Sequence, residues 1–131
     1  MPEYFTPEEA NAALERVRPL AERMVELRRS LSVAQRRQAR LAGVVAGNGH
    51  GNAARDYEAL TRELETGTAE LLACAEEIHG LGAIVKDLDD GLVDFPWLRD
   101  GEEVLLCWRV GEDEIRYWHG LDDGFAGRRE L

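Results

Sequence analysis

Apolar residues recur at alternating spacings of three and four along the first third of the chain. This seam predicts a long helix over residues 6–42, because three-four spacing places every member on one helical face. The same spacing is the heptad period of a left-handed coiled coil. The seam residues are Ala10, Ala13, Val17, Leu20, Met24, Leu27, Leu31, Ala34, Gln38 and Leu41. The helix start is marked by Thr6, which can cap it, and by Glu9, which can complete a capping box.

A second stretch with the same spacing predicts a second helix over residues 53–80. Its seam consists of Tyr57, Leu60, Leu64, Gly67, Leu71, Cys74, Ile78 and Leu81. The glycine-rich residues 43–52 lie between the two stretches and predict a flexible loop.

Charged residues beside the two seams favour antiparallel pairing of the predicted helices. The first seam is flanked by Arg16, Arg23, Ser30 and Arg37, and the second by Asp56, Glu63, Glu70 and Glu77. An antiparallel pair brings these two rows together, so basic residues meet acidic ones. Two registers one heptad apart satisfy this equally. We therefore predict an antiparallel two-helix coiled-coil hairpin in either register.

A second apolar stripe follows only part of each predicted helix. It consists of Leu14, Ala21 and Val25 on the first helix and Ala69, Leu72 and Ala73 on the second. Because a two-helix hairpin needs one seam only, this stripe requires a cover. Either the C-terminal region or another subunit supplies it.

The pattern changes to short alternating runs after Gly82. Residues 83–88 and 92–95 flank an Asp-Asp-Gly turn and predict a β-hairpin, in which Lys86 lies opposite Asp94. Pro96 is expected to end the second strand, because proline cannot donate a hydrogen bond to a neighbouring strand.

A second β-hairpin is predicted from residues 104–110 and 115–119, around a turn at Gly111-Glu112. This turn would place Leu106 opposite Tyr117. Residues 83–120 thus predict two hairpins, and residues 121–131 follow as a tail. The whole chain, residues 1–131, is expected to be a single α+β domain with a helical hairpin and a small antiparallel sheet of about four strands.

The overall charge and the cysteine content restrict the class of protein. The net charge of −10 argues against a general nucleic-acid binder, which must neutralise phosphates. The N-terminal residues lack the apolar stretch of an export signal, and no apolar run approaches the ~20 residues of a membrane span. The two cysteines, Cys74 and Cys107, lie far apart in sequence and are expected to be reduced thiols. We expect a cytoplasmic protein with no nucleic-acid or membrane partner.

Charge is also uneven along the predicted hairpin. Between Leu27 and Ala54 the chain has no acidic residue but five arginines, namely Arg28, Arg29, Arg36, Arg37 and Arg40. This basic tip is either a solvated face, partly neutralised by acidic residues across the hairpin, or a docking surface. In the second case its partner is an acidic protein or the acidic base of another copy.

Residues 104–128 hold the chemistry-bearing side chains. Cys107 and His119 are possible zinc ligands, but the predicted strand register puts them on opposite faces of the sheet. With no CxxC or HxxxH spacing in the chain, we predict no metal and no cofactor. No residue is assigned a catalytic role, since serine occurs only at positions 30 and 32. An anion or small molecule could instead be bound by Arg109, Trp118, His119 and Arg128. The competing interpretation is that these side chains only pack.

Three segments resemble those of a known family. They are FTPEEANAALERVRPL near the start, KDLDDGLVDFP in the middle and LLCWRVGEDEIRYWHGLDDGFAGR at the end. Together they cover nearly the whole chain outside the glycine-rich loop, and they resemble the uncharacterised bacterial domain of unknown function 2203 family. The resemblance implies membership of that family and no activity.

Two functional hypotheses follow from these features. The first is a non-enzymatic interaction or scaffold protein that self-associates, as a homodimer or a larger homo-oligomer, through its helical arms. The second is a small-molecule or anion-binding module, or an enzyme, with its site in the C-terminal segment.

Overall fold

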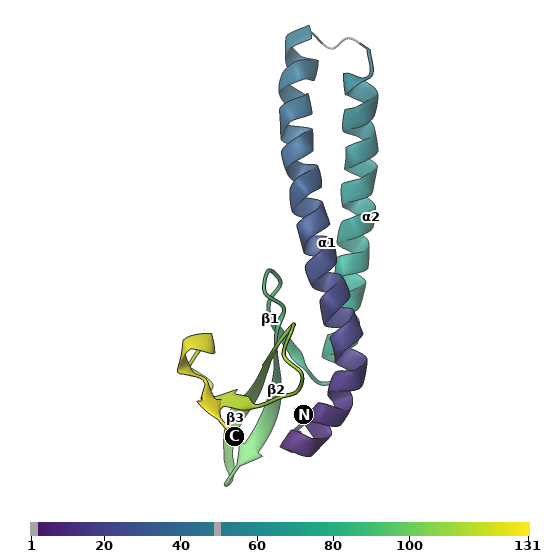
Figure 1. Cartoon of the computed structure of the whole chain (residues 1–131). Helices are drawn as coiled ribbons and strands as arrows, with labels where there is room; N and C mark the ends of the chain where they lie inside the picture. The colour runs from purple at the N-terminus through teal and green to yellow at the C-terminus, as the bar shows by residue number, and fades with distance from the viewer. Residues whose placement is uncertain (1–2, 49–50) are drawn as a thin grey trace.

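The structure is a computed structural model that describes residues 3–48 and 51–131. Two long helices form a hairpin, and an antiparallel sheet packs against the lower part of the hairpin, leaving the upper part uncovered (Figure 1). The elements are α1 (Pro7–Asn48), α2 (Ala53–Gly80), β1 (Ile84–Asp87), β2 (Leu92–Arg99), β3 (Glu102–Arg109), β4 (Tyr117–His119), the short 3-10 helix η1 (Phe125–Gly127) and β5 (Arg129–Glu130). The five strands lie in the order β1-β2-β3-β4-β5. The predicted α+β class is confirmed.

Helix α1 begins at the predicted capping box. The Thr6 amide donates to Glu9 Oε1 over 2.9 Å, and the Glu9 amide donates to Thr6 Oγ1 over 3.1 Å. These bonds satisfy two backbone donors that a helix start otherwise leaves free.

The predicted end of the first helix at residue 42 is wrong, because α1 continues through Gly43 and Gly47 to Asn48. Residues 42, 45 and 46 line a hollow together with Tyr57 of α2. Contact with α2 therefore favours the helix over the intrinsic preference of glycine for a loop. The rest of the predicted loop lies partly outside the described residues, and residues 51 and 52 form a turn before α2.

Helix α2 has the predicted bounds and pairs antiparallel with α1. The Arg23 and Glu70 side chains form an ion pair with Nη2 and Oε2 2.8 Å apart. This contact selects one of the two registers that the sequence left open. The helices approach closely at Gly67, where an added Cβ would lie 2.8 Å from Leu31 Cδ2.

The sheet covers the second apolar stripe of α1 but not that of α2. Leu14, Ala21 and Val25 are at most 5% exposed, and the core that contains Leu14 and Ala21 also contains sheet residues. The sheet contributes Val93, Phe95, Leu106 and Trp108 to this core. On α2, by contrast, Leu72 is 56% exposed and both neighbouring alanines of its stripe are exposed.

The hairpin of β1 and β2 forms, but in a different register from the predicted one. Ile84 rather than Lys86 lies opposite Asp94, and the register shifts between Val85 and Asp87. Pro96 does not end the strand, since β2 pairs with β3 from Leu92 to Arg99. The proline is tolerated because β1 does not extend beside it, so its nitrogen faces no strand. Its carbonyl accepts a 2.7 Å hydrogen bond from the Phe5 amide.

The register of β3 and β4 differs from the prediction by one residue. Leu106 lies opposite Trp118, Leu105 opposite His119 and Cys107 opposite Tyr117. The cause is the connection, which is a seven-residue loop over residues 110–116 and not a two-residue turn at Gly111-Glu112. Because side chains alternate along a strand, this shift exchanges the two faces of β4.

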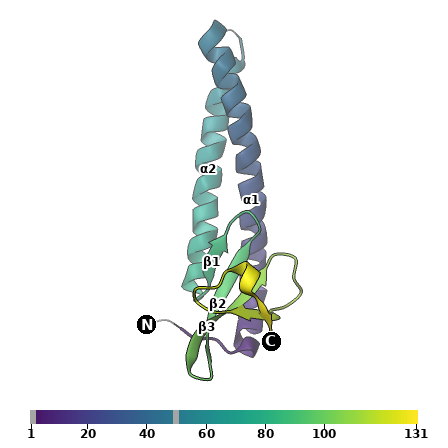
Figure 2. The ribbon, with the colours of Figure 1, turned by 90° about the vertical axis from the view of Figure 1, so that its left-hand side faces the viewer.

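Residues of the predicted tail complete the sheet and cover its outer face. Strand β5 pairs with β4 as the fifth strand. The segment between β4 and β5 crosses the side of the sheet that faces away from the helices (Figure 2). Beneath it, Leu105, Cys107 and His119 are each at most 4% exposed. Among the described residues, no helix combines the length and the apolar character needed to cross a membrane.

Candidate functional site

Three side chains with metal-binding donor atoms meet on the outer face of the sheet. Asp94 lies on β2 directly opposite Cys107 of β3, and His119 ends β4 on the same face. The three are 1%, 2% and 4% exposed, and their donor atoms all lie within 4.8 Å of one another. We call these residues the outer-face cluster.

The position of this cluster overturns the strand-register argument by which the sequence predicted no metal site. The predicted register placed Cys107 and His119 on opposite faces, and the observed one-residue shift places them on the same face. Asp94 was missed altogether, since the predicted hairpin only placed it opposite Lys86. The sequence did contain an indication of where Asp94 points. It lies between two apolar residues, Val93 and Phe95, and strand alternation therefore directs its carboxylate to the face opposite the core.

His119 is held in one orientation by two polar contacts. Its Nδ1 lies 2.8 Å from the Gly120 carbonyl oxygen, which can only accept, so Nδ1 bears a proton. Its Nε2 lies 3.1 Å from Asp94 Oδ2. The other carboxylate oxygen, Asp94 Oδ1, is buried and has no hydrogen-bond partner among the described residues.

The environment of Cys107 keeps its thiol protonated. Burial, followed by the negative charge of Asp94, raises the pKa of Cys107 to about 12, although the nearby Arg128 acts in the opposite direction. Nucleophilic cysteines require a lowered pKa and access to substrate. Cys107, which is buried and protonated, is therefore unsuited to act as a free nucleophile.

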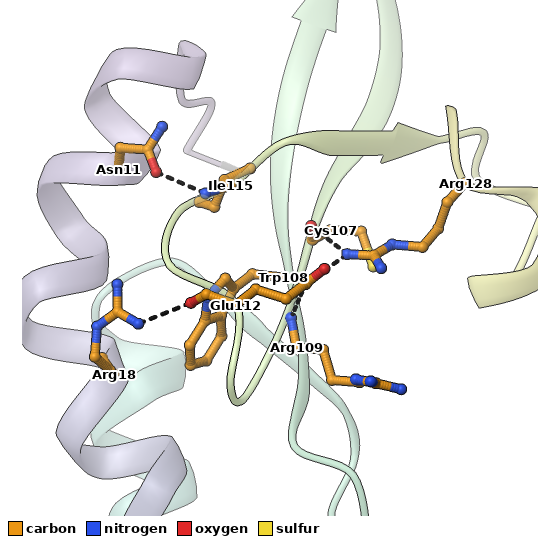
Figure 3. A network of polar contacts seen from close by, with 8 residues as sticks. All are labelled: Asn11, Arg18, Cys107, Trp108, Arg109, Glu112, Ile115 and Arg128. Atoms are coloured by element: carbon orange, nitrogen blue, oxygen red, sulfur yellow. Dashed lines mark hydrogen bonds and ion pairs between the residues drawn. The ribbon is translucent and has the colours of Figure 1, made fainter. Parts of the chain in front are cut away.

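Arg128 fastens the C-terminal segment over the cluster. Its Nη2 donates to Glu112 Oε1 over 2.6 Å and to the Cys107 carbonyl over 3.2 Å (Figure 3). Its guanidinium also lies over the rings of Tyr117, at 4.1 Å, and Phe125, at 4.6 Å. Burial acts to lower the pKa of Arg128, but the bond to Glu112 and the neighbouring charges raise it overall.

Glu112 is the centre of the loop that sets the register of β4. Its carboxylate accepts the Arg109 amide over 2.7 Å as well as Arg128, and its carbonyl accepts Arg18 Nη1 over 2.9 Å and Trp108 Nε1 over 3.0 Å. Asn11 of α1 also holds the loop, accepting the Ile115 amide over 2.8 Å (Figure 3). The sequence assigned Glu112 only to a turn, and no local signal indicates contacts with residues about a hundred positions earlier.

The four predicted ligand residues do not form one site. His119 lies in the outer-face cluster and Arg128 beside it, while Trp118 lies on the opposite face between Arg99, at 4.5 Å, and Arg129, at 5.1 Å. Arg109 is exposed, with its guanidinium 5.4 Å from the centroid of the Phe125 ring. The charge of Arg128 is already matched by Glu112.

The second candidate region is the part of the helical hairpin that the sheet does not cover, where several described arginines form no ion pair. We call residues 28–63 the distal arm. It contains seven arginines and three acidic residues, so it bears a charge of +4 in a chain whose net charge is −10. Within the described residues, no ion pair involves the arginines at positions 29, 36, 37 and 40.

Fold and sites together define an α+β protein with a helical arm on a small sheet and a buried polar cluster on the outer face of that sheet. The chain belongs to the family described as "Uncharacterized conserved protein (DUF2203)", whose model matches residues 3–131. This confirms the resemblance seen in the sequence. Neither a curated protein nor a solved structure matches the chain.

Proposed function

We propose that the protein is a non-enzymatic interaction protein that self-associates through its helical arm. The observation behind the proposal is the unmatched charge of the distal arm. Within the part of the chain that the structure describes, Arg28 is the one arginine of the α1 portion of the arm that forms an ion pair, with Asp89 of the β1–β2 turn at 3.1 Å. The remainder of the chain has a charge of −14, which is complementary to the +4 of the arm. A second copy in antiparallel orientation brings opposite charges together at both ends.

Self-association also needs apolar contact area, and apolar side chains on the helical hairpin supply it. A groove of about 420 Å³ runs between the helices, with Leu27, Leu31, Thr66 and Gly67 among its lining residues. Beside it, a second hollow of about 300 Å³ includes Val33, which is 49% exposed. Exposed apolar side chains next to such hollows are typical of surfaces that bind another chain.

The alternative, a small-molecule or anion-binding module in the C-terminal segment, has less support. Arg128 is paired with Glu112, and Trp118 faces away from His119.

The proposal assigns the protein to the cytoplasm, and its free, buried cysteines fit a reducing compartment.

Sedimentation equilibrium of the full chain at micromolar concentration tests the proposal. We expect a dimer or larger oligomer that dissociates as salt is raised, since exposed charges are screened beyond ~8 Å at physiological ionic strength. The double variant Arg36→Glu, Arg37→Glu should weaken association by about fourfold to several hundredfold, because a symmetric dimer contains four such reversed pairs and each changes binding by roughly 0.2–1 kcal/mol.

The matched control is Arg99→Glu, Arg116→Glu, which makes the same change in net charge on exposed residues of the sheet region. It should retain association. A strictly monomeric wild-type chain, or equal loss of association in both double variants, would refute self-association through the arm.

A further inference from the structure

We propose that Asp94, Cys107 and His119 form a binding site for a divalent transition metal of the zinc class. The site is independent of the self-association proposed above, since it lies on the sheet and not on the arm. A thiolate, an imidazole and a carboxylate are the donor types that zinc takes in proteins, and Cys107 would release its thiol proton to solvent on binding the metal. The sulfur donor disfavours magnesium and calcium, which bind oxygen.

The donor atoms are nearly at coordinating distance already. Nitrogen and oxygen ligands about 2.0–2.1 Å from a tetrahedral zinc ion are roughly 3.3 Å apart. His119 Nε2 and Asp94 Oδ2 are 3.1 Å apart. The cysteine sulfur lies within 4.8 Å of both, so a side-chain movement of at most about 1.3 Å brings it to the roughly 3.5 Å expected for a zinc-bound sulfur.

The hydrogen bonds of His119 prepare it for a metal. Its Nδ1 proton is directed to the Gly120 carbonyl over 2.8 Å, which leaves Nε2 as the atom that faces Asp94. Metal-binding histidines use this arrangement, in which a backbone carbonyl fixes the ring and its tautomer.

The cluster also contains a buried oxygen without a partner. Among the described residues Asp94 Oδ1 accepts no hydrogen bond, although its side chain is only 1% exposed. A buried acceptor with no partner is destabilising, because it has lost its hydrogen bonds to water without replacement. A metal ion removes this cost, because it draws on both carboxylate oxygens or on Oδ1 directly. The unmatched oxygen is thus a second observation, beside the donor distances, that favours cation binding at this cluster.

The surrounding structure makes the site rigid and selective. Asp94 and Cys107 are directly opposite each other on the two longest strands of the sheet. The nearby guanidinium of Arg128 is neutralised by Glu112 at 2.6 Å, so it does not oppose a second positive charge at full strength. Three protein donors leave a fourth position, as in zinc sites that bind water or a small ligand.

The test uses the full chain, stripped with a chelator and titrated with Co²⁺ as a spectroscopic probe. We expect one Co²⁺ per chain, with the visible bands of a tetrahedral ion and a near-ultraviolet sulfur-to-cobalt charge-transfer band. Zn²⁺ should abolish both signals by displacement. Zn²⁺ at a hundredfold excess over its Kd should raise the Tm by roughly 10 °C.

Variants distinguish the cluster from adventitious binding. Cys107→Ser should remove the charge-transfer band, and Asp94→Asn should weaken Co²⁺ binding at least about tenfold. The matched control Cys74→Ser changes the only other cysteine, which lies on α2, and should leave every signal unchanged. If a variant fails to fold, X-ray absorption of the zinc-loaded wild-type chain provides the same test, with one sulfur expected about 2.3 Å from the metal. The absence of a sulfur-to-cobalt band in wild type, or of a sulfur ligand in the zinc-loaded chain, overturns the proposal.

Discussion

The turn between β1 and β2 packs so tightly that one added methyl group should lower the stability of the protein by a measurable amount. Gly91 has φ +71°, and a Cβ at this position would overlap Val110 Cγ2 and lie 2.8 Å from Val25 Cγ2. Gly91→Ala therefore combines a left-handed backbone with overpacking between the turn, the β3–β4 loop and α1. Gly101, in the next turn, has φ +83° but nothing within 4 Å of an added Cβ.

The two glycines therefore separate backbone strain from packing. A left-handed conformation costs an alanine about 1–2 kcal/mol, and overpacking typically adds about 1–3 kcal/mol. We expect Gly91→Ala to lower the free energy of unfolding by about 2–5 kcal/mol and Gly101→Ala by about 1–2 kcal/mol. The effect of alanine on the unfolded chain is the same at both positions, so it cancels in the comparison.

Urea unfolding followed by circular dichroism measures both variants against wild type, with the free energy taken from linear extrapolation. The difference between the two variants should be about 1–3 kcal/mol. Equal destabilisation would show that the turn does not pack against Val25 and Val110 as described, and would refute the account of how the sheet is seated on α1.

Two further substitutions test the loop that sets the register and the start of α1. Glu112→Gln removes the charge that Arg128 meets at 2.6 Å in a partly buried site, and should lower the free energy of unfolding by about 1.5–3 kcal/mol. Glu114→Gln, which alters an exposed pair with Arg116, should stay within about 0.5 kcal/mol of wild type, and similar losses in both would contradict the role given to Glu112. Thr6→Ala removes the capping bond to the Glu9 amide and should cost about 1 kcal/mol in urea unfolding, whereas Thr68→Ala, at an exposed position within α2, should cost less than half of that. No difference between the two threonine variants would argue against the capping box.

The helical half of the fold was predictable because its determinants are local. Three-four spacing fixes which face of each helix is buried, and Thr6 and Glu9 fix where the first begins. The second helix has the predicted bounds, Ala53–Gly80. The prediction failed at the end of α1, where contact with Tyr57 of the other helix extends the helix past two glycines.

The candidate site was predictable only in part. His119 was identified from its position at the end of a strand, and the structure places it in the outer-face cluster. Its partners were not identified, since Asp94 was placed in the wrong register and the predicted register of β4 put His119 on the face opposite to that of Cys107. Both errors concern strand pairing, in which a shift of one residue moves every side chain to the other face.

The sequence by itself determined the two helices, their antiparallel pairing, the change to short strands and the charge difference between arm and base. Each of these follows from the spacing of residue types along the chain. Only the tertiary structure decided which side chains of β3 and β4 share a face. That choice depends on Arg18 and Asn11 of α1, which bind the 110–116 loop from about a hundred residues away. Contacts across such a distance leave no periodic trace in the sequence, yet they bring Cys107, His119 and Asp94 together.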